Sequence, residues 1–284
     1  MFTEKNFPAD WCLPVEADIL ATLKRIAPRI GDDCAVIPNG EEDLLFTTDM
    51  LLESVHFLRK QPAEFVGAKA VLRAMSDIAA MGGEPRYCLL SVAFGDWADT
   101  RWINRFYSGA TGALRSFKTE LIGGDMARTR RFGCDVTLVG AVPHGEALLR
   151  SGARAGDGIY VSGPLGRAAS EEYSGLPEPK IRFGQWLRGR ASGCMDLSDG
   201  LSLDLKRMCV ASQVAAELTD IPVWTGATEK QALDGGDDYE LLFTAADRIS
   251  KAGVKRIGTI IEGKPGAITL RGKKLEPRGF DHFR

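Results

Sequence analysis

The sequence predicts an α/β protein made of two domains, each built around a mixed β-sheet. The chain has 284 residues, which is enough for two domains of ordinary size. Its hydrophobic content of 44% and its charged content of 26% are typical of a globular protein. Short apolar runs that fit buried strands alternate with longer segments in which apolar residues recur at helical spacing. Such alternation is typical of α/β architectures.

The first half reads as one α/β unit. Its expected elements are, in order, strands at 34–37 and 44–48, a helix at 63–81, a strand at 86–94, a helix at 100–118, and strands at 119–123 and 134–142. The first of these helices has Val71, Met75 and Ile78 at a spacing of four and three residues, and it is stopped by Gly82 and Gly83. The second helix shows the same pattern.

The second half follows a connector at 143–158. Its expected elements are strands at 158–162, 214–218, 239–244, 256–261 and 267–270, and a helix at 200–212. The segment 173–193 is rich in glycine, proline and charge, and we expect a loop or a short helix at the surface. We therefore place one domain at residues 1–143 and a second at residues 144–284.

Composition and motifs exclude several classes of function. The formal net charge of −2 offers no basic surface for nucleic acid. No apolar run approaches the ~18 residues that span a membrane, and the start lacks a signal-peptide pattern, so we expect a cytoplasmic protein without membrane contact. The sequence has no Walker A, GxGxxG or GxSxG motif.

Cysteine and histidine usage bears on metal binding. None of the six cysteines forms a CxxC pair, and the three histidines form no HExxH motif. We expect most cysteines to be small buried hydrophobic residues. Any metal is therefore expected to be held by oxygen, which favours magnesium, calcium or manganese.

Aspartates recur where apolar runs end or helices begin. They stand in GDDCAVIP (31–38), LLFTTDML (44–51), RAMSDIAAMGG (73–83), LIGGDMAR (121–128), CMDLSDGLSLDL (194–205) and GGDDYELLF (235–243). Taken singly, each has a structural alternative. Asp77 can pair with Arg73 on a helix surface, and Asp125 can be a turn residue after two glycines. Asp196 or Asp199 can cap the helix that follows.

Taken as a set, the aspartates indicate a ligand site. Ligand crevices of α/β sheets form where strands end, so these loops are expected to converge. Two carboxylates ~5 Å apart repel by about 3 kcal/mol at an effective dielectric constant of about 20. A cluster of this kind needs cations, and Mg²⁺ suits it because Mg²⁺ binds carboxylates together with phosphate oxygens. The residues thus point to a magnesium-dependent enzyme acting on phosphates.

Eight stretches, in this order, resemble the thiamine-monophosphate kinase family, within the superfamily of aminoimidazole ribonucleotide synthetase-like ATP enzymes. They are GDDCAVI, TTDMLLESVHF, SDIAAMGGEP, GGD, LRSGARAGDGIYVSGPLG, MDLSDGL, GGDDYELLFT and GFDHF. The resemblance spans nearly the whole chain. It implies a PurM-like α/β fold with a ferredoxin-like N-terminal domain, and homodimers paired through the N-terminal sheets.

The resemblance also implies a reaction. The γ-phosphoryl group of ATP would pass directly, in line, to thiamine monophosphate, giving thiamine diphosphate and ADP. The acceptor is a phosphate whose second pKa is near 6, so it is mostly deprotonated at pH 7 and needs no general base. Catalysis would then rest on charge neutralisation and positioning by metal ions.

Site residues follow from the same resemblance. It assigns several Mg²⁺ ions to Asp32, Thr47, Thr48, Asp49, Asp77, Asp125, Asp196 and Asp199. It assigns contacts with ATP to Tyr107, Gly124, Asp125, Arg150 and Ser198. It assigns contacts with thiamine monophosphate to His56, Asp237 and Phe280. The catalytic positions are expected to be Asp49, Asp77, Asp125, Asp196 and Asp199.

Some of these assignments have a chemical rationale and an alternative. A cationic thiazolium favours a carboxylate and an aromatic face. His56 could instead be a satisfied structural histidine, and Phe280 a hydrophobic plug. Asp33 and Asp238, the second acids of their pairs, are expected to be structural and to cap loop backbone.

The sequence departs from the family pattern in a few places. Met126 and Ala127 follow GGD where the family has hydroxyl residues, and two connections of the second half are short. Rival readings are a sibling enzyme and a nucleotide- or metal-binding regulator without turnover. A purely structural α/β protein would leave so many aspartates at element ends unexplained. A selenophosphate synthetase would need a reactive cysteine and lysine near the start, which Lys5 and Cys12 fit poorly. A hydrogenase-maturation relative would need a C-terminal cysteine, and a purine-synthesis relative remains open.

Overall fold

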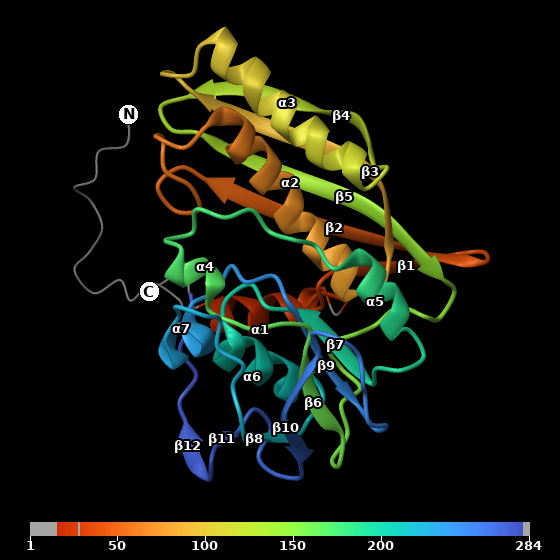
Figure 1. The fold of residues 1–284 in the computed structure, drawn as a ribbon. Coiled ribbons are helices and arrows are strands. Elements are labelled where there is room, and N and C mark those ends of the chain that lie inside the picture. The colour runs from red at the N-terminus through yellow and green to blue at the C-terminus, as the bar shows by residue number, and fades with distance from the viewer. Residues whose placement is uncertain (1–15, 28, 281–284) are drawn as a thin grey trace.

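The first half of the chain forms a five-stranded mixed sheet (Figure 1). The computed structural model describes residues 16–27 and 29–280, so Lys5 and Cys12 lie outside it. The strands are β1 (Ala35–Asn39), β2 (Glu42–Leu52), β3 (Glu84–Gly95), β4 (Glu120–Thr129) and β5 (Gly133–Pro143). Their order is β1-β2-β5-β3-β4, and only β3 and β4 are parallel.

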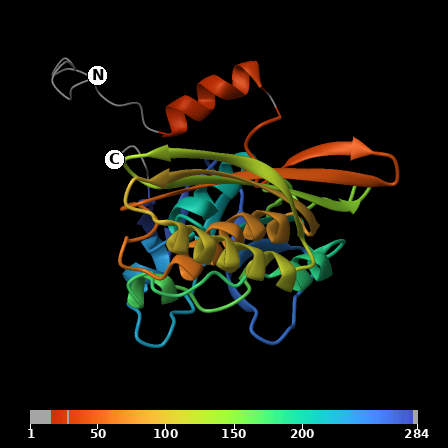
Figure 2. The same cartoon turned by 90° about the horizontal axis from the view of Figure 1, so that it is seen from above.

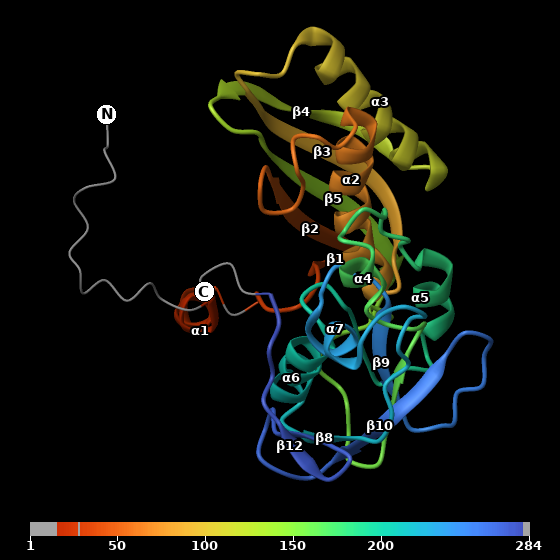
Figure 3. The same ribbon diagram turned by 60° about the vertical axis from the view of Figure 1, so that its left-hand side comes forward.

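Two helices cover one face of this sheet, α2 (Ala63–Ala80) and α3 (Thr100–Ser116) (Figure 2). The helix α2 is buried on most of its circumference because it also contacts the second half of the chain. The helix α3 begins at Asp99, whose carboxylate accepts a hydrogen bond from the Trp102 backbone N–H, and buries one apolar face. The helix α1 (Glu16–Ile26) lies on the other side of the sheet and stands apart from it (Figures 2 and 3).

The second half forms a seven-stranded mixed sheet in the order β12-β11-β8-β10-β6-β9-β7. Its strands are β6 (Gly158–Val161), β7 (Gly193–Asp196), β8 (Ala215–Leu218), β9 (Leu241–Ala245), β10 (Lys255–Ile261), β11 (Ile268–Leu270) and β12 (Lys273–Leu275). Its helices are α4 (Arg167–Ser170), α5 (Ile181–Leu187), α6 (Leu201–Ala211) and α7 (Glu229–Asp234). Only β8 and β11 are parallel neighbours.

A buried apolar cluster joins the two halves. It contains Ala80 at the end of α2, Leu187 of α5 and Phe243 of β9. The helix α5 lies so close to α2 that a Cβ at Gly184 would stand 1.9 Å from the Ala79 carbonyl oxygen. Only glycine permits this approach. The end of α2 is thereby fixed against the second sheet, where the aspartates gather.

The predicted α/β class with two mixed sheets is confirmed. The first sheet ends at Pro143 and the second begins at Gly158, while the domain boundary at 143/144 stays a prediction. The sequence pattern did not predict α1, α4, β7, α7 and β12. The segment 173–193 contains the expected short helix, α5, although Ile181 and Leu187 of that helix are buried. The strand β4 runs to Thr129, well beyond the predicted end at 123.

Two further expectations concern the whole molecule. The five cysteines that the structure describes are all buried and free, as expected for small core residues. Among residues 16–27 and 29–280, none of the helices combines the length and hydropathy that crossing a bilayer requires.

Candidate active site

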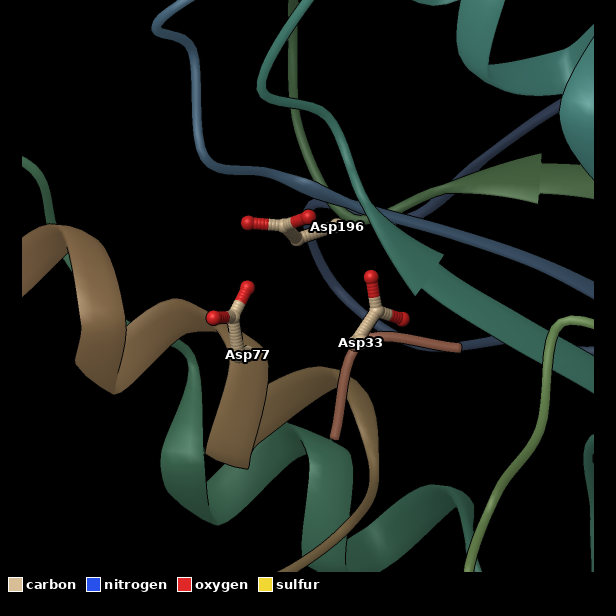
Figure 4. Close-up of side chains that lie close together, drawn as sticks. All are labelled: Asp33, Asp77 and Asp196. Atoms are coloured by element: carbon tan, nitrogen blue, oxygen red, sulfur yellow. The ribbon is translucent and has the colours of Figure 1, made fainter. Parts of the chain in front are cut away.

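Three aspartates from three separate segments point toward one another (Figure 4). Asp33 precedes β1, Asp77 lies in the last turns of α2, and Asp196 is the last residue of β7. One carboxylate oxygen from each can be chosen so that all three lie within 4.8 Å of one another. The site therefore draws on both halves of the chain.

The three carboxylates are poorly compensated by their surroundings. Asp33 is 8% exposed and Asp196 is 2% exposed. The Thr47 hydroxyl donates a hydrogen bond to Asp77, and the Arg150 Nε donates one to Asp33 over 3.1 Å. Within the described part of the chain, however, Oδ2 of Asp33 and Oδ2 of Asp196 are buried and accept no hydrogen bond. Buried oxygens of this kind are costly unless a cation or a donor meets them.

The electrostatics of the cluster favour protonation in the absence of a cation. Burial raises the pKa of Asp196 well above its ordinary value, and the neighbouring Asp33 raises it further. The pKa of Asp77 is raised by burial and then by Asp196 and Asp33. Burial, followed by repulsion from Asp33, raises the pKa of Asp32 to about 6. The fold thus holds acids together that cannot all be charged on their own.

A hard divalent cation fits this donor set. The available ligands are carboxylate oxygens, with the Thr47 hydroxyl beside them, and no sulfur or imidazole is offered by the cluster. Oxygen donors select Mg²⁺, Mn²⁺ or Ca²⁺ over softer metals. Asp33, Asp77 and Asp196 are the residues that would hold such an ion.

Beside the cluster opens a cleft of about 570 Å³. Its lining residues are Thr48, Asp49, Val55, His56, Phe57, Leu58, Gln61, Lys69, Arg73, Asp77, Glu172, Tyr173, Asp196, Ser198, Asp199, Gly235, Gly236, Asp237, Tyr239 and Phe280. Asp77 and Asp196 belong to both the cluster and the cleft lining, so a ligand in the cleft reaches the acidic cluster directly.

Away from the cluster, the cleft contains two cation–carboxylate pairs. The buried Lys69 ammonium lies 2.8 Å from Oδ2 of Asp237, and the Arg73 Nε lies 3.1 Å from Oδ2 of Asp49. Although burial acts in the opposite direction, Lys69 and Arg73 hold the pKa of Asp237 below its ordinary value. Burial outweighs Arg73 at Asp49, whose pKa is raised.

Aromatic and apolar side chains line the same region. The rings of His56 and Phe280 are tilted to each other with centroids 6.4 Å apart. Phe280 is 43% exposed and borders the cleft, which does not fit a buried plug. His56 Nδ1 accepts a hydrogen bond from the Leu52 backbone N–H, so this ring is anchored as well as presented to the cleft.

The loop between β7 and α6 presents Ser198 and Asp199 to the cleft. The helix α6 starts after Gly200 without a side-chain cap, so the alternative that Asp196 or Asp199 caps it is wrong. Asp204 instead accepts hydrogen bonds from the backbone N–H groups of Asp199 and Gly200. This buried carboxylate fixes the loop and leaves Asp199 facing the cleft.

Known proteins share this architecture over nearly the full chain. A family model described as AIR synthase related protein, N-terminal domain, matches residues 31–142. The thiamine-monophosphate kinase of Aquifex aeolicus is 33% identical over 287 residues, covering 89% of this chain and 92% of that protein. The thiamine-monophosphate kinase of Salmonella typhimurium is 35% identical, and the match covers 89% of this chain and 91% of that protein. The chain belongs to the thiamine-monophosphate kinase family.

A solved structure of a relative supports the same assignment. The complex of AaThiL with AMPPCP and TMP superimposes with a TM-score of 0.89 at 31% identity, covering 94% of this chain and 97% of that one. This relative therefore has the same fold as the chain and binds AMPPCP together with TMP.

Most positions that the kinase resemblance assigned lie together. Those that line the cleft are Thr48, Asp49, His56, Asp77, Asp196, Ser198, Asp199, Asp237 and Phe280. Three more assigned residues contact the aspartates of the site: Thr47, Arg150 and Asp32. The Thr47 hydroxyl donates a hydrogen bond to Asp77. The Arg150 backbone N–H donates to Asp32 over 3.1 Å, and the Arg150 guanidinium pairs with Asp33. The hydroxyl of Thr48 donates to Asp135 over 2.7 Å.

Three further positions assigned by the resemblance lie on α3 and β4, outside the cleft lining. Tyr107 lies on α3, where it packs against Phe94 and Phe106. Gly124 and Asp125 are exposed on the edge strand β4, so the alternative that Asp125 occupies a turn is wrong. Gly124 has φ +154°, and a Cβ there would lie 2.0 Å from the Leu90 carbonyl oxygen, so this position requires glycine.

Several residues of the cleft and of the acidic cluster were not predicted from the sequence. Asp33 was expected to be structural, yet it belongs to the acidic cluster as well as pairing with Arg150. Lys69 and Arg73 were not assigned, although they precede Asp77 by eight and four residues on one helix, a spacing that places all three along one face. Arg73 pairs with Asp49, so the alternative in which it forms a surface pair with Asp77 is wrong. Asp238 caps backbone as expected, accepting from the Gly166 and Ala168 N–H groups.

Proposed function

We propose that this chain transfers the γ-phosphoryl group of ATP to thiamine monophosphate, forming thiamine diphosphate and ADP. The observation that carries the proposal is the cleft itself, which joins a buried acidic cluster to a pocket lined by aromatic side chains and paired charges. The acidic cluster suits a complex of a metal ion with a nucleotide. The pocket with aromatic side chains and paired charges suits an acceptor that is phosphorylated, cationic and aromatic. Family membership supports the pairing, since a relative binds AMPPCP and TMP together.

The acidic cluster is the proposed site of Mg²⁺. Asp33, Asp77 and Asp196 would hold the ion, and Asp32, Thr47, Thr48, Asp49, Asp125 and Asp199 are the further positions that the family resemblance assigns to several ions. When bound, magnesium neutralises the phosphate charges and aligns them for in-line transfer. The protein's part is to keep the three carboxylates converged, with Thr47 and Arg150 fixing two of them.

The acceptor needs no proton removed by the protein. A phosphomonoester has its second pKa near 6 and is mostly dianionic at neutral pH. The described residues lining the cleft include a single histidine, His56, whose Nδ1 accepts from the Leu52 backbone. In this proposal the His56 ring contacts the thiamine together with Phe280 and Asp237 and takes no proton from the phosphate. The position of all three residues in the cleft lining supports it.

Nucleotide contacts are assigned to both sides of the cluster. Ser198 lines the cleft, and Arg150 stands behind Asp33. Tyr107, Gly124 and Asp125 lie outside the cleft of the single chain, and their proposed contact with ATP rests on the family pattern alone. A cytoplasmic location likewise stays a prediction.

We also propose a homodimer paired through the first sheet. Register places Ile37, Phe46, Met50, Tyr87 and Leu89 on the face opposite to α2 and α3. All five side chains are exposed to between 37% and 54%. Contiguous exposed apolar side chains of this kind mark interaction surfaces. Sedimentation of a monomer at micromolar concentration would contradict the dimer.

The reaction is tested by separating the products. ADP and thiamine phosphates are measured after incubation with ATP and Mg²⁺ together with thiamine monophosphate, with thiamine, or with neither. The expected result is thiamine diphosphate from the monophosphate alone. ATP binding without any turnover would replace the proposal with a regulatory role, and turnover of another acceptor would replace it with a sibling reaction.

A further inference from the structure

One cationic side chain of the cleft, that of Arg73, has a donor group that no described residue accepts from. The Arg73 side chain is 10% exposed, and it borders the cleft between Asp49 and Asp237. Its Nε and Nη2 face the carboxylate of Asp49, at 3.1 Å from Oδ2 and 3.3 Å from Oδ1. Its Nη1 is buried and has no hydrogen-bond acceptor among residues 16–27 and 29–280.

The chemistry of the guanidinium indicates which kind of acceptor would suit the Nη1 group of Arg73. The guanidinium is planar, always charged, and presents its donors as a fixed fork that matches carboxylate or phosphate oxygens. Asp49 occupies one side of that fork, and the Nη1 side remains for another acceptor. A buried donor without an acceptor is costly, so a ligand oxygen that meets it contributes directly to binding.

The position of Arg73 along α2 indicates which ligand group it meets. Lys69, Arg73 and Asp77 follow one another at intervals of four residues and all line the cleft. Four residues of an α-helix correspond to a rise of about 6 Å. The Lys69 end adjoins Asp237, which the family resemblance places at the thiamine moiety, and the Asp77 end belongs to the acidic cluster. Arg73 stands between the two, where the phosphate of the acceptor must lie if it is to meet the metal-bound nucleotide.

We propose that Arg73 binds the phosphate group of the acceptor, and that it thereby selects a phosphorylated thiamine over free thiamine. The inference rests on the proposed function for the identity of the acceptor. It assigns a role to a residue that lies one helical turn from the acidic cluster and is not itself a candidate metal ligand. Asp49, which the family resemblance also assigns to a metal ion, pairs with the guanidinium and holds it in place.

The test compares two ligands that differ only in the phosphate. Binding of thiamine monophosphate and of thiamine is measured by calorimetry on the full chain, together with KM for thiamine monophosphate and for ATP. The variants are Arg73→Gln, which loses the charge, and Arg73→Lys, which keeps a point charge beside Asp49. The matched control is Arg105→Gln, since Arg105 pairs with Glu64 at the surface outside the cleft.

The expected result is a selective loss of affinity. Arg73→Gln should lower the affinity for thiamine monophosphate by about tenfold to a hundredfold, because one charged hydrogen bond is lost. The affinity for thiamine should stay unchanged. Arg73→Lys should lie between the wild type and Arg73→Gln, and Arg105→Gln should match the wild type. Should Arg73→Gln fail to fold, the selective loss in Arg73→Lys carries the test.

Two results would overturn the inference. One is an equal loss of affinity for thiamine and its monophosphate, which would make Arg73 a structural residue. The other is a raised KM for ATP alone, which would place the nucleotide at Arg73. Failure of the wild type to form thiamine diphosphate would instead reject the proposed function. Even then, Arg73-dependent binding of thiamine monophosphate but not of thiamine would keep the phosphate contact.

Discussion

The two ends of the cleft along α2 differ in whether their carboxylates are paired with cationic side chains. At the Asp77 end, three carboxylates converge and two of their buried oxygens accept no hydrogen bond from any described residue. At the Lys69 end, the lysine and Arg73 each face one carboxylate. The first end needs a cation from outside. At the second end each cation faces a carboxylate, and Nη1 of Arg73 is left without an acceptor among the described residues. The contrast indicates that the acidic end suits a metal ion and that the other end suits an anionic group of the ligand.

The acidic end should give the largest effect on turnover. Asp196→Asn removes a proposed metal ligand and should lower kcat/KM by about a hundredfold or more, equivalent to several kcal/mol of transition-state stabilisation. The same change should raise the unfolding temperature measured in EDTA, because it removes a carboxylate whose charged form is disfavoured by burial and by Asp33. Steady-state kinetics and thermal unfolding of one variant check both.

The matched control for this variant is Asp220→Asn, which changes an exposed aspartate beyond the cleft. It should alter neither turnover nor the unfolding temperature in EDTA. An Asp196→Asn protein that is less stable than the wild type in EDTA would show that the acidic end is compensated without a cation.

The paired end should give the largest effect on stability. Lys69→Met leaves Asp237 without the ammonium 2.8 Å away and should lower the free energy of unfolding by about 3 kcal/mol. Urea unfolding followed by circular dichroism measures the loss. A change as small as that of a surface pair would mean that Arg73 alone balances Asp237.

The dependence on pH should differ with and without magnesium. The folded-state pKa values of Asp32, Asp77 and Asp196 are raised, that of Asp32 to about 6. Their contribution to the stability of the metal-free protein is present at acidic pH and is lost as pH rises through these folded values. Mg²⁺ requires the charged form, so its stabilising effect should grow from pH 5 to pH 8.

Acids elsewhere, such as Asp43, have lowered pKa values and act with the opposite sign. The quantity to follow is therefore the unfolding temperature in Mg²⁺ minus that in EDTA at each pH. A difference that stays constant between pH 5 and pH 8 would contradict linkage between the acidic cluster and the metal.

The smallest effect is expected at the surface. Glu42 and Arg86 form a bidentate pair in which both side chains are at least one-third exposed. Surface pairs contribute little because solvent and salt screen them. Glu42→Gln should leave urea unfolding and turnover within experimental error, and a loss comparable to that of Lys69→Met would remove the distinction between buried and exposed pairs.

The α/β class was predictable because its signals are local. Helical spacing marked α2 and α3, and glycines marked the end of α2. Shorter elements were missed although some carried a signal. The helix α7 begins at Thr228, which forms a capping box with Gln231, and this pattern is readable as Thr-x-x-Gln. The strand β7 is only four residues long and derives its stability from its pairing with β9, which no local pattern reveals.

The sequence allowed many residues of the candidate site to be predicted, but not which of their side chains contact one another. Most of the positions that the resemblance assigned line the cleft. The resemblance could not distinguish Asp32 from Asp33, since only the fold determines which carboxylate turns toward Asp77. The pairing of Arg73 with Asp49 depends on how α2 lies on β2. Asp125 lies on the edge strand because β4 continues beyond its predicted end.

Metal binding at the acidic end is the most direct test of the account. Manganese, a magnesium substitute, is titrated into the wild type, Asp196→Asn and Asp220→Asn, and free Mn²⁺ is followed by electron paramagnetic resonance. The account predicts a tight site in the wild type and in Asp220→Asn that is lost in Asp196→Asn. Equal manganese binding by all three proteins would contradict it, because the converged carboxylates would then not be the site of the ion.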